Sequence, residues 1–167
     1  MNAGAVRATT DLETRATHAD HEALRLWLRL LATTNGLEAL VRGRLQSQFG
    51  TTLARFDYLA QLERAGEGLR MSELSERLMV TGGNVTGLTN ALVQEGMVTR
   101  ETVDEDRRAC RVRLTAVGRR SFRAMAVEHE GWIVDACSAL NSRELAQLKD
   151  LLGRIKERVR STTRKTA

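Results

Sequence analysis

The stretch that decides the fold covers residues 71–114 and reads MSELSERLMV, TGGNVTGLTNALVQEG, MVTRE, TVDEDRRAC and RVRL. Its first segment predicts a short helix, because Leu74 and Leu78 stand four positions apart on one face and Ser72 is a suitable N-cap. The next segment predicts a second helix, with Thr81 as its N-cap and a glycine just beyond its last periodic residue.

The second predicted helix has two contrasting faces. Val85, Leu88 and Leu92 share one apolar stripe. The opposite face is small, uncharged and able to hydrogen-bond, and consists of Gly83, Asn84, Thr86, Gly87, Thr89 and Asn90. A face that enters the major groove of DNA needs short donors and acceptors, whereas a solvated face normally carries charges. The pattern predicts either a base-reading face or an ordinary surface helix of low charge.

Two short strands follow this helix. MVTRE and RVRLT alternate apolar and polar residues, which predicts half-buried strands with Val98, Val112 and Leu114 pointing inward. The connection TVDEDRRAC is too polar to belong to a core. Helix, turn, helix and two-stranded ribbon in this order predict a winged helix-turn-helix.

Arginine is concentrated at the predicted ribbon and just after it. From Arg107 to Arg123 the chain carries seven arginines and no acidic residue. Such a run favours phosphate as a partner, and an arginine at the ribbon tip can enter a minor groove. Alternatively, Arg107 and Arg108 only pair with the acidic residues 104–106. Because this charged turn follows the two predicted helices at the spacing of a wing, we favour DNA as the partner. The predicted DNA-binding residues are Thr81, Gly83, Asn84, Thr86, Thr89, Asn90, Arg107, Arg108 and Arg111.

Four motifs in this order resemble the MarR-type (multiple antibiotic resistance regulator) transcription factors. They are LSERLMVTGGNVTGL at 74–88, EGMV at 95–98, DEDRRA at 104–109 and LTAVG at 114–118, and the likeness extends over about residues 24–159. The resemblance implies a homodimer with one winged helix-turn-helix in each subunit. It also implies a pseudo-palindromic DNA operator as partner, and release of that operator by a small ligand.

Long amphipathic segments flank the central unit. Apolar residues recur at helical spacing over about 20–48, where residues 33–36 suggest a kink or a local weakness, and again after the wing. Thr52, Thr115 and Asn141 are the expected caps of the helices that follow them. The apolar faces exceed what one subunit can cover, so a second copy of the chain is the expected partner.

The expected fold class is mainly α with a small β-wing. A disordered N-terminal arm is predicted over 1–17, followed by a single domain over 18–167. Within that domain, the winged helix-turn-helix is expected over about 52–118 and dimerisation helices over about 20–48 and 119–160.

Two segments resemble a branch of the same family that is associated with aromatic-acid catabolism. They are LRLWLRLL at 24–31 and FGTTLARFD at 49–57, although Ala54 stands where that branch often has proline. The resemblance implies an aromatic carboxylate or its coenzyme A thioester as effector. The candidate lining residues are Arg25, Trp27, Arg29, Phe49, Arg55, Phe56 and Tyr58. Plain core or dimer packing is the alternative for Phe56 and Trp27.

Composition narrows the class of protein. With 167 residues, 42% of them hydrophobic, the chain can build one core, and its net charge of +5 suits a nucleic-acid partner. No apolar run is long enough for a membrane span and no signal peptide is recognisable, so a cytoplasmic protein is expected. Cys110 and Cys137 lack metal or disulfide spacing.

Catalysis finds no support in the sequence. No nucleophile elbow or phosphate-binding glycine loop is present, and the potential metal ligands His18, Asp20, His21 and Glu22 read as a solvated helix end. We therefore predict no enzyme, no cofactor and no metal site. The alternative to a DNA-binding regulator is a winged-helix adaptor for other proteins.

Overall fold

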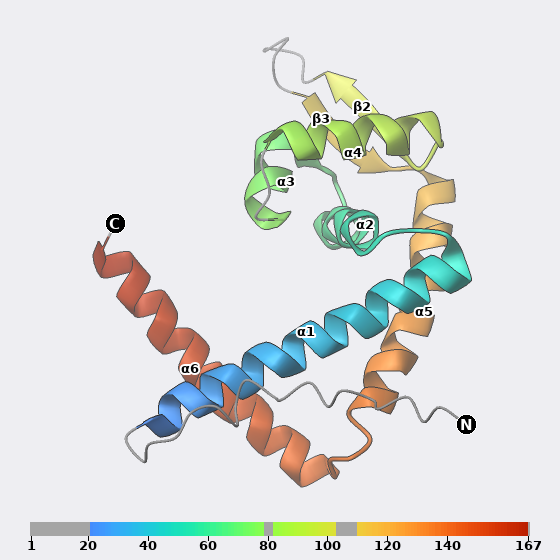
Figure 1. The fold of residues 1–167 in the computed structure, drawn as a ribbon. Coiled ribbons are helices and arrows are strands. Elements are labelled where there is room, and N and C mark those ends of the chain that lie inside the picture. Colours follow the sequence, from blue (N-terminus) through green and yellow to red (C-terminus); the bar gives the residue numbers. More distant parts are fainter. Residues whose placement is uncertain (1–20, 79–81, 103–109, 167) are drawn as a thin grey trace, which may run out of the picture. The chain divides into compact units, whose positions relative to one another are not determined.

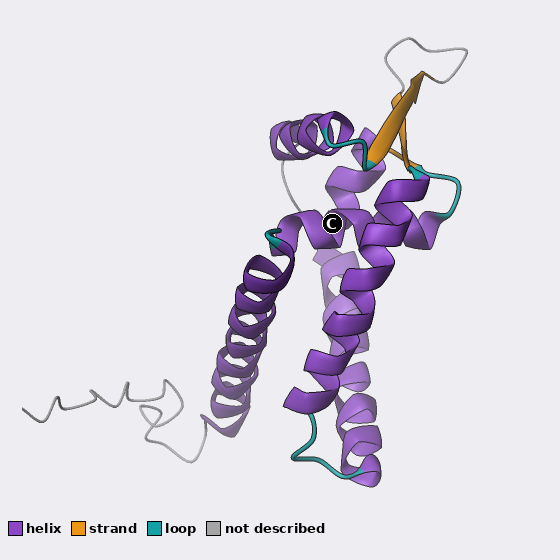
Figure 2. Ribbon diagram, turned by 90° about the vertical axis from the view of Figure 1, so that its right-hand side faces the viewer, coloured by secondary structure: helices purple, strands orange, loops and turns teal. Residues whose placement is uncertain are grey.

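The computed structural model describes residues 21–78, 82–102 and 110–166 (Figure 1). The chain falls into two compact units, Met1–Val127 and Glu128–Ala167. Helices make up most of both, with one small antiparallel sheet in the first unit (Figure 2). The predicted fold class is confirmed, whereas the predicted N-terminal arm lies outside the described residues.

Two helices open the first unit. Helix α1 (Glu22–Phe49) runs unbroken through residues 33–36 and ends at Gly50, whose φ of 61° is left-handed. Helix α2 (Leu53–Ala65) begins at Thr52, whose hydroxyl accepts a hydrogen bond from the backbone N–H of Arg55, as predicted. This hydrogen bond satisfies one of the free backbone N–H groups at the start of α2.

The helix-turn-helix follows. It consists of α3 (Met71–Leu78) and α4 (Gly82–Gln94). The prediction that Ser72 caps α3 is wrong, because the helix already includes Met71. Instead, the carboxylate of Glu73 accepts a hydrogen bond from the backbone N–H of Arg70, which satisfies one donor at the helix start.

The sheet has three strands rather than the two predicted. Strands β1 (Leu69–Arg70), β2 (Val98–Thr102) and β3 (Cys110–Leu114) lie in the order β1-β3-β2, all antiparallel. In β1, Leu69 pairs with Val112. The backbone of β3 comes close to Gly68, so that a side chain at this position would collide with the carbonyl of Val112. The φ of Gly68, 82°, also favours glycine.

The core of the first unit joins α2, the helix-turn-helix and the sheet. Its fully buried side chains come from α2, α3, α4 and the strands, and include Tyr58, Leu59, Leu62, Leu74, Val85, Thr89, Leu92, Val98 and Val112. Leu114, which was predicted to point inward, is half-buried. Phe56 packs its ring against Phe122 of α5 (Ala116–Ala136), with centroids 5.5 Å apart. Thr115 caps α5 by accepting a hydrogen bond from the N–H of Gly118.

The second unit comprises the end of α5 and helix α6 (Ser142–Thr166). Asn141 and Glu144 form the predicted capping box, in which each side chain accepts a hydrogen bond from the other residue's backbone N–H. One face of α6 exposes a row of large apolar side chains, namely Leu145, Leu148, Leu151, Leu152, Ile155 and Val159. Among the described residues, no helix is long and apolar enough to cross a membrane.

Candidate nucleic-acid interface

Helix α4 presents an exposed face without charge. Gly83, Asn84, Thr86, Gly87 and Asn90 are all exposed, while Val85 and Leu92 on the other side are fully buried. Apart from Thr89, the outward face predicted from the sequence is therefore the one that solvent reaches. Its side chains are short and offer amide and hydroxyl groups, which is the chemistry that reads base edges in a major groove.

The glycines of α4 are not explained by packing within the chain. A Cβ added at Gly83 or Gly87 would meet nothing within 4 Å. Glycine inside a helix costs roughly 0.5–1 kcal/mol relative to alanine, so these positions weaken α4 without relieving any internal clash. Glycine at such a site instead permits close approach of a second surface to the helix backbone.

The prediction that Thr89 binds DNA is wrong. Thr89 was expected on the outward face, but its exposed fraction is 0%. Its hydroxyl lies 2.6 Å from the hydroxyl of Tyr58 and 2.7 Å from the carbonyl oxygen of Val85. Thr89 therefore supports α4 from within and cannot touch DNA in this conformation.

The stem of the wing lies beside α4. Arg100 of β2 donates a hydrogen bond to Oδ1 of Asn90 over 3.0 Å. This contact was not predicted, because the two residues belong to different elements and neither has a distinctive spacing. It joins an exposed cation to the uncharged face of α4, so a single anionic partner could contact both.

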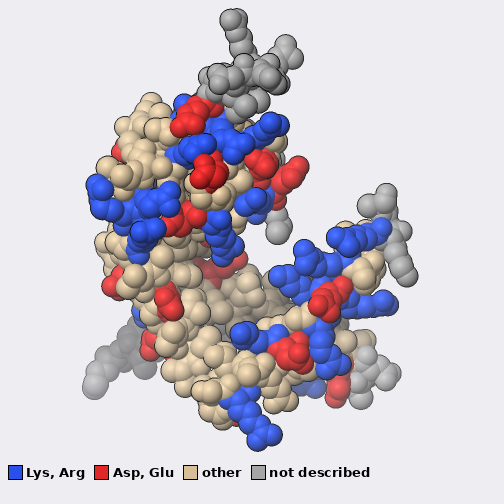
Figure 3. All heavy atoms as spheres, turned by 180° about the vertical axis from the view of Figure 1, so that it is seen from behind, with Lys and Arg blue, Asp and Glu red and all other residues tan. Residues whose placement is uncertain are grey.

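Most arginines of the run are already paired in the described part of the chain. Arg113 contacts Glu67 and Glu101, and Arg119 and Arg123 both contact Glu63. The sequence suggested a free cationic field here, but acidic side chains from α2, from the loop after α2 and from β2 partly neutralise it. Figure 3 shows basic side chains, all of them arginine in this part of the chain, interspersed with acidic side chains around the sheet.

The remaining predicted DNA contacts are only partly described. Thr81, Arg107 and Arg108 lie outside the described residues. Arg111 is half-buried, and its guanidinium donates hydrogen bonds to the carbonyl oxygens of Glu67 and Gly68. Arg111 thus helps to hold β1 against β3, which is a structural role that the sequence did not reveal.

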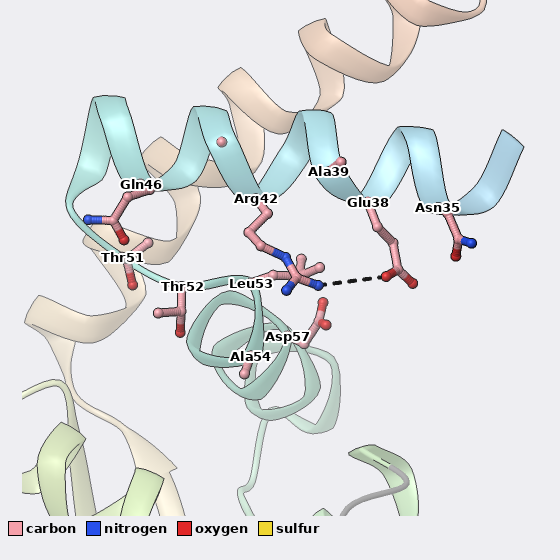
Figure 4. A pocket seen from close by; sticks show the side chains of 11 residues that line it. Asn35, Glu38, Ala39, Arg42, Gln46, Thr51, Thr52, Leu53, Ala54 and Asp57 are labelled. Carbon is pink, nitrogen blue, oxygen red and sulfur yellow. Dashed lines mark ion pairs between the residues drawn. The ribbon is translucent and has the colours of Figure 1, made fainter. Parts of the chain in front are cut away.

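A cavity with a volume of about 1050 Å³ lies between α1 and the start of α2. Figure 4 shows Arg42 and Glu38 reaching from α1 toward α2, with Asp57 opposite. Arg42 and Glu38 form an ion pair of 3.8 Å. Apolar surface is supplied by Ala39, Leu53 and Ala54.

None of the seven predicted ligand residues lines this cavity. Phe56 and Tyr58 are core residues, which corrects their assignment to a pocket, and Trp27 is exposed on α1. Arg25 and Arg29 are also exposed on α1. Phe49 and Arg55 line a separate cavity of about 140 Å³, where Arg55 pairs with Glu95.

Comparison with known proteins gives the family. A sequence profile of the MarR family matches residues 49–109, which hold α2, α3, α4 and β2. The transcriptional regulator PecS of Dickeya dadantii is 28% identical over 113 residues, or 66% of this chain and 68% of PecS. A MarR family transcriptional regulator from Silicibacter pomeroyi is 30% identical with a TM-score of 0.70, and the match covers 84% of this chain and 96% of that one. The chain belongs to the MarR family.

One further solved structure and one further sequence relative match a large part of this chain. AbsC from Streptomyces coelicolor superposes with a TM-score of 0.73 at 25% identity, over 86% of this chain and 97% of AbsC. An uncharacterised regulator from Bacillus cereus is 36% identical over 76 residues, which is half the length of that protein. The resemblance to the branch for aromatic-acid catabolism has no counterpart in these matches.

Proposed function

We propose that this MarR-family chain is a cytoplasmic transcriptional repressor, which binds a pseudo-palindromic operator as a homodimer and is released by an aromatic carboxylate or its coenzyme A thioester. The observation that carries the DNA-binding part is the exposed, uncharged, glycine-containing face of α4, with Arg100 beside it. Asn84, Thr86 and Asn90 are the residues proposed to meet base edges or adjacent phosphates.

The comparisons support this proposal through the fold. A mutant form of MarR from E. coli has been crystallised in complex with operator DNA, and its fold matches this chain with a TM-score of 0.69 at 23% identity. In a helix-turn-helix protein, the second helix lies in the major groove with its N-terminal residues on the bases. In this chain that helix is α4, and its N-terminal half carries the exposed polar residues.

The homodimer is proposed from the apolar faces left uncovered. The row on α6 and the α1 side chains Leu24, Leu26 and Trp27 are exposed in the single chain, with Trp27 57% accessible. Apolar surface of this extent is unfavourable in water and marks an interaction site. A two-fold dimer would bury the same apolar helix faces on both copies and would place two recognition helices on successive half-sites.

The effector is proposed to occupy the cavity between α1 and α2. Ala39, Leu53 and Ala54 supply apolar surface for a ring, and Arg42 can exchange Glu38 for the carboxylate of a ligand. The ligand would release DNA only if it binds the free state more tightly than the operator-bound state.

Selection of duplexes from a random library tests the DNA-binding part. The wild-type protein should enrich a pseudo-palindrome whose half-sites lie about one helical turn apart. Asn84→Ala should bind the selected operator more weakly, whereas Gln94→Ala, at the other end of α4, should bind it like wild type. Enrichment of no sequence, or equal affinity for operator and random duplex, would favour an adaptor role.

A thermal-shift panel of benzoates, hydroxycinnamates, nicotinates and their thioesters tests the effector. A ligand should raise the Tm of the wild-type protein and lower its affinity for the operator. Arg42→Gln should bind the same ligand more weakly while keeping operator affinity. A panel without any Tm shift would remove the aromatic effector but leave the DNA-binding proposal standing.

A further inference from the structure

Helix α2 makes one polar contact with α4 and one with the turn that follows α4. Near its N-terminus, Arg55 forms an ion pair with Glu95, just beyond the end of α4. One turn later, the hydroxyl of Tyr58 meets the hydroxyl of Thr89 inside the core, where both residues have an exposed fraction of 0%. The Tyr58–Thr89 contact lies on the buried side of α4, opposite the face proposed to read DNA.

The direction of the buried hydrogen bonds follows from counting protons. Thr89 has one hydroxyl proton, and its shortest acceptor is the carbonyl oxygen of Val85 at 2.7 Å, one turn earlier in α4. Tyr58 must then donate to the oxygen of Thr89 across 2.6 Å. The chain of donors runs from Tyr58 through Thr89 to the backbone of α4, so α2 holds the backbone of that helix and not only a side chain.

A hydrogen bond can fix the rotation of a helix about its own axis, which apolar packing leaves free. The buried contacts of Val85 and Leu92 resist separation of α4 from the core, but hydrophobic contacts have no preferred direction. A rotation of α4 by about 10° moves side-chain atoms that lie about 5 Å from the helix axis by about 1 Å. If that displacement carries Thr89 away from Tyr58, it stretches their 2.6 Å contact beyond the usual range for O–H···O bonds, and in the opposite sense it forces the two oxygens together. On the opposite side it would move Asn90 by a similar distance, and productive recognition geometry tolerates about 0.5 Å.

We propose that Tyr58 is a positioning residue for DNA recognition, which fixes the rotation of α4 through Thr89 so that Asn84 and Asn90 meet the bases in register. This inference rests on the proposed function, because it assumes that α4 reads DNA. It assigns the only tyrosine of the chain a role in specificity and not only in core packing.

Two conservative substitutions separate the hydrogen bond from the packing. Tyr58→Phe keeps the ring and leaves Thr89 bonded to Val85, so no buried group loses its only partner. Thr89→Ser keeps the hydroxyl and should preserve recognition. Val41→Ala truncates a buried side chain of α1, outside both α2 and α4, and serves as the control for lower stability.

The test measures Kd for the selected operator and for a random duplex of equal length, at one salt concentration and with all variants verified as folded. Tyr58→Phe should lower the ratio of specific to random binding by about 5- to 150-fold, the loss expected for one misplaced base contact. Binding to the random duplex should stay within about twofold, since phosphate contacts do not depend on the rotation. Thr89→Ser and Val41→Ala should keep the wild-type ratio.

A spectroscopic measurement checks the contact itself. Because Tyr58 is the only tyrosine, a sample with ¹³C-labelled tyrosine rings gives one NMR signal for this position. The signal should stay in place in Thr89→Ser and move in Thr89→Val, which lacks the hydroxyl. A signal that does not move in Thr89→Val would show that the two hydroxyls are not bonded in solution, and this would overturn the proposal.

The outcomes distinguish this inference from the proposed function. A wild-type protein that prefers no operator refutes the function, and the inference falls with it. A wild-type protein that prefers an operator, together with an unchanged ratio in Tyr58→Phe, refutes the inference alone. An equal loss in Val41→Ala would assign the effect to stability and would also overturn it.

Discussion

Replacing two leucines of α6 should dissociate the dimer. Leu148 and Leu152 have exposed fractions of 40% and 37% in the single chain. Full burial of a leucine contributes about 1.5–3 kcal/mol, so covering the remaining two-fifths contributes about 0.6–1.2 kcal/mol per position. In a symmetric dimer both copies contribute, which gives about 2.4–4.8 kcal/mol for the two positions together. The double variant Leu148→Asp/Leu152→Asp should therefore raise the dimer Kd by about 50- to 3,000-fold.

These figures are a lower bound, because each aspartate also places a charge in the apolar interface. Sedimentation velocity over a concentration series measures the Kd directly. Ala146→Asp/Gln147→Asp is the matched control, since both residues are exposed on α6 away from the apolar row. The control should remain dimeric and bind the operator. A wild-type protein that sediments as a monomer at micromolar concentration, or an equal loss in both double variants, would refute the reasoning.

Three further predictions concern single positions. Gly87→Ala should raise the free energy of unfolding by about 0.4–1 kcal/mol in a urea titration, because the added Cβ meets no other atom within the chain. It should weaken operator binding, measured by fluorescence anisotropy, because the same Cβ would obstruct the close approach of DNA to α4. Gly118→Ala should lower the free energy of unfolding by about 1–3 kcal/mol in the same titration, because its Cβ would collide with the carbonyl of Met97. Burial raises the pKa of Tyr58 above its ordinary value of 10.0. The stability that its neutral phenol contributes is thus present below pH 10 and lost as pH rises through the raised pKa, and urea midpoints of Tyr58→Phe should lack this loss.

Local signals in the sequence predicted most of the fold. The caps at Thr52, Thr115 and Asn141 were recognisable because a cap depends on residues within one turn. The helices of the helix-turn-helix and the two main strands followed from apolar periodicity. Strand β1 was missed because two residues carry no periodicity, and its partner in β3 lies more than forty positions later.

The errors at the candidate site have a common physical cause. Thr89 looks like an outward polar residue until Tyr58, thirty-one positions away, supplies a buried partner. The arginines after the wing look free until Glu63 and Glu67 from distant segments pair with them. The role of a polar side chain depends on its partner. When the partner belongs to another element, no local sequence pattern indicates the pair. A pocket between the first two helices was expected, but its lining residues were not, because those that α1 supplies are exposed polar or small residues without a distinctive spacing.

The central claim is that α4 reads base edges, and base-by-base affinity mapping tests it most directly. Each base pair of the selected operator is replaced in turn, and Kd is measured for the wild-type protein and for Asn84→Ala. The account predicts that Asn84→Ala loses about 1–3 kcal/mol of discrimination at one symmetric position in each half-site and keeps the rest of the profile. Profiles of Asn84→Ala, Thr86→Ala and Asn90→Ala that all coincide with that of the wild type would contradict it.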